Sequence, residues 1–150
     1  MTTEYERTIA RTKAVLTEEH KKAMGSKGIE ALYDAVMIMA FADGEIVDDE
    51  ARFLNDFAEY LGTKGSDDDL TDDALLGRLS SLSMPPLCSE AFIKVILIVC
   101  DLDDDQAEDE LKLWRDIGRA LGLTNERMAK IRSLLHQARA TTRKLDGDKT

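Results

Sequence analysis

One stretch of the sequence occurs twice, as VMIMAFADGEIVDDEARFLNDFAEYLG (36–62) and as ILIVCDLDDDQAEDELKLWRDIGRALG (96–122). Each copy runs from an apolar segment into an acidic segment, and then into an amphipathic segment that ends in Leu-Gly. The positions that match include Ile38 and Ile98, Asp43 and Asp103, Glu50 and Glu110, and Gly62 and Gly122. Because self-similarity at a fixed spacing marks a duplicated structural unit, we expect both copies to adopt one conformation.

The shared conformation decides whether the apolar segment of the second copy forms a helix or a strand. Ile and Val dominate residues 92–100, which taken alone could form a buried strand. The first copy enters its acidic segment from ALYDAVMIMAFA (31–42), which is rich in Ala and Met, and these residues favour helix. The prediction is therefore an all-α, single-domain bundle with an internal pseudo-twofold repeat, in which two apolar helices form the centre and amphipathic helices cover them.

Caps and helix breakers divide the chain into about seven predicted helices. They span about 3–24, 29–42, 48–61, 71–81, 90–101 and 108–121, followed by a last helix that TNER (124–127) opens. We expect Gly62 and Gly122 to end the third and sixth helices, and Thr124 to cap the last. Pro85-Pro86 should stop the fourth helix, and Ser89 should cap the fifth. The expected apolar face of the last helix is Met128, Ile131, Leu134, Leu135 and Ala138.

The length of the chain suits one compact domain over residues 1–150. Its core is expected at about 29–135, with 1–24 as an accessory helix and 145–150 as a frayed tail. The formal net charge of −10 disfavours nucleic acid and anionic membrane surfaces, and favours cations or a protein partner with a basic surface. The most apolar run, 91–100, is too short to span a membrane, so we expect no transmembrane segment.

Outside the acidic segments, the sequence gives few indications of function. Cys88 and Cys100 lie in or beside apolar runs, so we expect buried free thiols and a reducing, cytoplasmic location. The N-terminal segment MTTEYERTIARTK is charged and does not resemble a signal peptide. The sequence contains no nucleophile-base spacing and no phosphate-binding glycine loop, so we expect that the protein is not an enzyme.

The two acidic segments hold more carboxylates than a helix start requires. FADGEIVDDE (41–50) contains five, and DLDDDQAEDE (101–110) contains seven. Acids in the first turn complement the helix dipole, but a capping box would place Val47 and Ala107 at the cap, and neither side chain can accept a hydrogen bond. The surplus charge is repulsive unless solvent, salt or a bound cation relieves it.

Ca²⁺ or Mg²⁺, which take oxygen ligands, would suit such segments. The candidate ligands are Asp43, Glu45, Glu50, Asp103, Asp105 and Glu110. The second segment is not an EF-hand, because Gln106 and Lys112 stand where that loop needs Gly and Glu. Zinc is disfavoured because His20 and His136 lie outside both segments. The alternative is a metal-independent interaction module whose solvated acidic surface recognises a basic partner.

The pattern Ala42-Asp43-Gly44-Glu45, followed by Glu50 and then by Leu61-Gly62, resembles the TerB-like family of tellurite-resistance and stress-associated proteins. The second copy, with Asp103, Glu110 and Leu121-Gly122, is similar to the duplicated plan of that family, and the resemblance covers about 29–135. It implies an all-helical domain with acidic residues that bind divalent metal, and an association with stress or tellurite resistance. The second copy departs from the pattern at Asp104, which stands where the first copy has Gly44.

Overall fold

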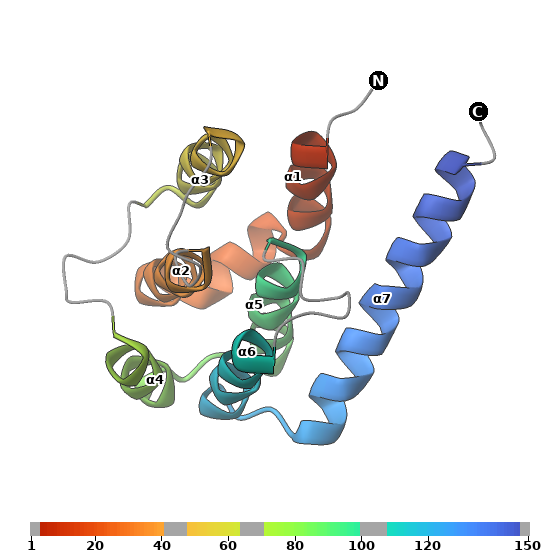
Figure 1. The fold of residues 1–150 in the computed structure, drawn as a ribbon. Helices are drawn as coiled ribbons and strands as arrows, with labels where there is room; N and C mark the ends of the chain where they lie inside the picture. The colour runs from red at the N-terminus through yellow and green to blue at the C-terminus, as the bar shows by residue number, and fades with distance from the viewer. Residues whose placement is uncertain (1–3, 41–47, 64–70, 100–107, 148–150) are drawn as a thin grey trace.

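A computed structural model describes residues 4–40, 48–63, 71–99 and 108–147, and these residues form an all-α bundle of seven helices (Figure 1). The helices are α1 (Glu4–Val15), α2 (Glu18–Ala40), α3 (Asp48–Leu61), α4 (Asp72–Ser81), α5 (Pro86–Val99), α6 (Glu108–Ala120) and α7 (Asn125–Gly147). The described part of the chain contains no strand, so the prediction of helix for residues 92–99 is confirmed. None of the described helices is long and apolar enough to cross a membrane.

Helix α5 lies at the centre of the bundle and contacts α1, α2, α6 and α7 (Figure 1). It is apolar on nearly every side, and buries a continuous run from Ala91 to Ile93 and another from Val95 to Ile98. Helix α2 packs against α5 and also contacts α3 and α4. The prediction of an apolar central helix is confirmed for α5, whereas α2 also carries exposed residues over 22–27 and buries the charged Asp34.

The predicted ends of α3 and α6 are confirmed. Gly62 and Gly122 both have positive φ, at 76° and 94°. The amides of Gly62 and Thr63 donate to the Ala58 carbonyl at 2.8 and 3.2 Å, which closes the last turn of α3. Glycine fits these positions because it adopts a left-handed backbone without the steric cost of a Cβ.

The single helix expected at 3–24 is wrong, because the chain bends between α1 and α2. The Thr17 hydroxyl accepts from the His20 amide at 3.3 Å, while His20 Nδ1 accepts from the Thr17 amide at 3.2 Å. This reciprocal pair is a capping box in which His takes the place of Glu or Gln, and it starts α2 at Glu18. The break expected at 25–28 is present as a kink, where Gly25 has φ 74° inside α2.

The start predicted for the fifth helix is also wrong. Helix α5 begins at Pro86, and proline suits this position because the first amide of a helix has no partner within the helix. The Pro85 carbonyl accepts from the Ser89 amide at 3.0 Å. Ser89 is therefore inside the helix and buried, and its hydroxyl donates to the Leu121 carbonyl at 3.5 Å instead of capping α5. The range predicted for α4, about 71–81, is confirmed. Thr71 caps the helix, because its hydroxyl accepts from the Ala74 amide at 3.1 Å.

Helix α7 lies along one side of the molecule and packs on α5 and α6 (Figure 1). The Thr124 hydroxyl accepts from the Arg127 amide at 3.1 Å, which confirms the predicted cap. Met128 and Ile131 are buried as expected, but Leu134 is 52 % exposed, so its assignment to the apolar face is wrong. The helix turns Leu134 away from α5 and α6, whereas Leu135 packs against the core.

Candidate functional site

The acidic segments lie in the sequence between α2 and α3 and between α5 and α6. Helix α2 ends at Ala40 and α3 begins at Asp48, while α5 ends at Val99 and α6 begins at Glu108. Glu50 and Glu110 are therefore each the third residue of a helix. Their side chains, and all of Asp43, Glu45, Asp103 and Asp105, lie outside the described residues. The assignment of these six residues to a metal site stays a prediction.

The rest of the described chain gathers no group of three or more His, Cys, Asp or Glu side chains that could hold a metal ion. Its most buried carboxylate is Asp34 on α2, which is 1 % exposed. Arg78 on α4 donates from Nη1 to Asp34 Oδ2 at 2.7 Å. A buried carboxylate is tolerated only when it is paired, so this ion pair fixes α4 on α2 and has a structural role.

A second polar cluster joins α1 and α2 to α3. The Tyr60 hydroxyl donates to the Leu16 carbonyl at 2.5 Å, and the Lys21 ammonium donates to the Tyr60 carbonyl at 2.7 Å. The same ammonium lies 3.8 Å from the centroid of the Tyr60 ring. Burial raises the pKa of Tyr60, Lys21 lowers it and Glu18 raises it, so the phenol stays protonated and able to donate.

Cys88 on α5 is a free, buried thiol, as predicted. Its Sγ donates to the His20 carbonyl at 3.7 Å, and burial raises the pKa of the thiol. A raised pKa lowers the thiolate fraction, so Cys88 is a poor nucleophile and a poor metal ligand. Cys100 lies outside the described residues.

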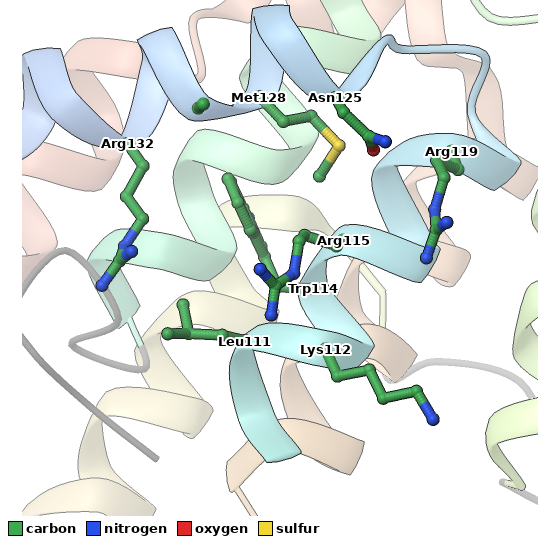
Figure 2. Close-up of a pocket in the computed structure, with 9 residues that line it drawn as sticks. Leu111, Lys112, Trp114, Arg115, Arg119, Asn125, Met128 and Arg132 are labelled. Atoms are coloured by element: carbon green, nitrogen blue, oxygen red, sulfur yellow. The ribbon is translucent and has the colours of Figure 1, made fainter. Parts of the chain in front are cut away.

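A pocket of about 540 Å³ opens between α6 and α7 (Figure 2). Its lining residues on α6 are Leu111, Lys112, Trp114, Arg115 and Arg119. Those on α7 are Asn125, Met128, Ala129 and Arg132. The guanidinium of Arg115 projects between Arg119 on one side and Arg132 on the other (Figure 2). We call this feature the α6–α7 pocket.

The sequence did not predict this pocket. A signal was present in Lys112, Arg115 and Arg119, whose spacings of three and four residues place them along one side of a helix. What the sequence did not reveal was that Arg132 of the next helix faces the same space. That arrangement depends on how α6 and α7 cross, which a helical periodicity does not specify.

Comparison of the chain with protein-family models, with curated proteins and with solved structures finds no match.

Proposed function

We propose that the protein is a TerB-like helical domain that binds a divalent cation, Ca²⁺ or Mg²⁺, through two acidic segments of a duplicated unit. The observation that carries the proposal is the register of the helices with the repeat. Helices α3 and α6 begin at Asp48 and Glu108, the same sixty residues apart as the two copies in the sequence. The candidate ligands therefore stand at equivalent places relative to each helix start.

The chemistry of the donor set supports a hard cation. Ca²⁺ takes six to eight oxygen ligands and Mg²⁺ takes six, and both prefer carboxylates. Each segment offers two carboxylates that precede the helix in sequence and one from the first turn of the helix: Asp43, Glu45 and Glu50 in the first, and Asp103, Asp105 and Glu110 in the second. Water and backbone carbonyls would complete the shell. A bound cation would also relieve the repulsion among neighbouring carboxylates.

Thermal melts of metal-stripped protein test this proposal. They are recorded with EDTA and then with Ca²⁺, Mg²⁺, Mn²⁺ or Zn²⁺ at matched ionic strength. A ligand at about 100 times its Kd stabilises the native state by roughly 2.7 kcal/mol, which should raise the Tm of a domain of this size by about 5–10 °C. Glu50→Gln and Glu110→Gln should reduce the rise.

The matched control is Glu59→Gln, which removes one charge from the exposed side of α3 outside the proposed ligand set. It should leave the cation-dependent rise unchanged. Equal small rises with every divalent ion, insensitive to Glu50→Gln and Glu110→Gln, would show charge screening and overturn the proposal.

A metal-independent interaction module is the second candidate. It is favoured by the separation of charge along the chain. Residues 111–144 contain nine Lys or Arg and two Asp or Glu, which gives this part a formal charge of +7. Because the net charge of the chain is −10, the remaining residues together carry −17. An acidic surface of that density attracts a basic partner. Such binding should weaken with salt and with charge reversal at Asp103, Asp104 and Asp105, and pull-downs that withstand both would refute it.

A further inference from the structure

We propose that the start of α2 is a pH-sensitive segment, in which protonation of His20 opens the turn between α1 and α2. The two helices meet at a bend, and the part of α2 that follows it, residues 18–24, ends at the kink at Gly25. All of these residues lie in the described part of the chain, outside the two acidic segments.

The hydrogen bonds of the cap fix the state of the His20 ring. Its Nδ1 lies 3.2 Å from the Thr17 amide nitrogen and accepts the hydrogen of that amide. An imidazole nitrogen accepts only when it carries no hydrogen, so the hydrogen of the neutral ring is on Nε2. In the protonated ring both nitrogens carry hydrogen, and the Thr17 amide loses this acceptor. Protonation therefore removes one half of the reciprocal cap.

The position of the ring in the helix disfavours its charged form. His20 is the third residue of α2, so it lies in the first turn, where the positive end of the helix dipole repels a cation. Lys21 and Lys22 follow it in the sequence and add like charge. Glu18 and Glu19 act in the opposite direction, but Glu18 already pairs with Lys21 at 2.8 Å.

The neighbouring helices contribute no negative charge through the contacts described at this junction. Helix α1 contributes Lys13, whose ammonium lies 5.4 Å from the centroid of the Tyr60 ring of α3. Helix α5 contributes Cys88, whose Sγ donates to the His20 carbonyl at 3.7 Å. The pKa values of Tyr60 and Cys88 are raised by burial, so both groups are neutral wherever an imidazole changes its charge.

The segment 18–24 has little stability of its own. It forms about two turns, and a helix of that length is marginal in water. The kink, with φ 74° and ψ 173° at Gly25, interrupts the helical geometry between this segment and the rest of α2. Lys21 and the buried Met24 anchor its later residues, so the cap is what orders its first turn. Loss of the acceptor at His20 should therefore open that turn and leave the bundle folded.

Amide hydrogen exchange of the full chain, followed by ¹H–¹⁵N NMR at about pH 7.5 and about pH 5.5, tests this proposal, because imidazole changes its charge in that range. The buffer contains EDTA at constant ionic strength, and protection is corrected for the intrinsic exchange rate at each pH. In the wild type, the protection of the Thr17 and Lys21 amides should fall by about fivefold at the lower pH, which is the effect of one net hydrogen bond.

His20→Gln is the matched variant, because Gln is a usual member of a capping box and its carbonyl accepts at either pH. Its protection should be the same at both pH values. His20→Ala lacks the acceptor, so the same two amides should be weakly protected at both. His136→Gln removes the other histidine of the chain, at an exposed position of α7, and should leave the wild-type response unchanged.

Three results would overturn the proposal. One is equal protection of the Thr17 and Lys21 amides at both pH values in the wild type. The second is a fall in His20→Gln as large as that in the wild type, which would assign the response to carboxylates. The third is loss of the response in His136→Gln, which would assign it to α7.

Discussion

Helices α3 and α6 occupy equivalent places in the sequence repeat, yet different contacts hold them. Helix α3 packs on α2 through Phe57, whose ring centroid lies 6.4 Å from that of Tyr33 on α2 and 5.6 Å from that of Phe53 within α3. Helix α6 is held by Trp114, which is 2 % exposed and hydrogen-bonded to the backbone of α5. The pattern of apolar positions thus specifies where such a helix lies, while the identity of each side chain decides how firmly it is held.

Substitution at Trp114 should give the largest effect in this comparison. Trp114→Ala removes a fully buried indole and leaves the Ile93 carbonyl without that donor, so the free energy of unfolding should fall by about 3–5 kcal/mol. Leu54, sixty residues earlier in α3, is 6 % exposed, and Leu54→Ala should cost roughly 2–4 kcal/mol. Urea unfolding at 25 °C measures both. A smaller loss for Trp114→Ala than for Leu54→Ala would contradict the comparison.

The two central helices differ as well, because α2 buries the charged Asp34, whereas Lys94, sixty residues later on α5, is only half-buried. Arg78→Met should lower the free energy of unfolding by about 2–3 kcal/mol, since it removes an ionic partner of Asp34. This is less than for a fully buried pair, because the Arg78 side chain is 29 % exposed.

The double variant Asp34→Asn/Arg78→Met is the control for that pair. It should recover part of the loss, because the buried charge is gone. Equal stabilities of the single and double variants in urea unfolding would show that the ion pair does not hold α4 on α2.

The glycine ends of α3 and α6 should respond alike. Gly62→Ala and Gly122→Ala should each cost about 1–2 kcal/mol, because both positions have positive φ and nothing lies within 4 Å of an added Cβ. The cost is therefore that of the backbone alone, and thermal denaturation measures it. A loss at one glycine with none at the other would break the equivalence of the two helix ends.

Gly118 on α6 provides a smaller and more specific test. A Cβ there would lie 2.2 Å from Met128 Cε, so Gly118→Ala forces the buried Met128 to move. Overpacking costs about 1–3 kcal/mol against a gain of about 1 kcal/mol in helix propensity, so we expect a net loss near 1 kcal/mol.

Gly77 on α4 is the matched control for Gly118, because nothing lies within 4 Å of its added Cβ. Gly77→Ala should raise the free energy of unfolding by about 0.5–1 kcal/mol in the same urea titrations. A gain of equal size in Gly118→Ala would mean that α6 and α7 are not closely packed there.

The smallest effect expected is a loss of stability at alkaline pH. The pKa values of Tyr33, Tyr60 and Cys88 are raised in the folded protein, mainly by burial. A group whose pKa is raised by folding stabilises the native state at pH below its pKa in the unfolded chain, which is 10.0 for Tyr and 9.0 for Cys. This stability is lost as the pH rises through the pKa of the group in the folded protein.

Tyr60→Phe measures how much of the alkaline loss of stability comes from the Tyr60 phenol. The variant should be less stable at neutral pH, because it lacks the hydrogen bond to Leu16, but its decline above about pH 10 should be shallower. Urea midpoints measured between pH 7 and 11 follow the decline. An alkaline decline as steep as that of the wild type would contradict the assignment to Tyr60.

Most of the fold could be predicted because residues close together in the sequence determine where most of its helices begin and end. Gly62, Gly122, Thr71 and Thr124 end or start their helices for reasons confined to a few neighbouring residues. The start of α2 was missed because His20 stands where a capping box has Glu or Gln. The start of α5 escapes prediction because Pro85-Pro86 indicates the end of a helix, whereas proline also suits a first helical position.

The features that escaped prediction depend on tertiary contacts. The pairing of Asp34 with Arg78 joins residues from two helices, and no periodicity in either one indicates it. The α6–α7 pocket likewise depends on the packing of two helices, because Arg115 of α6 and Arg132 of α7 line one space. The six proposed metal ligands could be selected from charge and spacing alone, and they stay a prediction because their side chains lie outside the described residues.

The most direct test of the proposed cation site is a ¹H–¹⁵N NMR titration of metal-stripped protein with Ca²⁺ and Mg²⁺ at constant ionic strength. The account predicts saturable shifts for amides in 41–51 and 101–111, including Glu50 and Glu110, with little change along α7. Shifts spread evenly over all the acidic surface, or none at concentrations that saturate an ordinary carboxylate site, would contradict it.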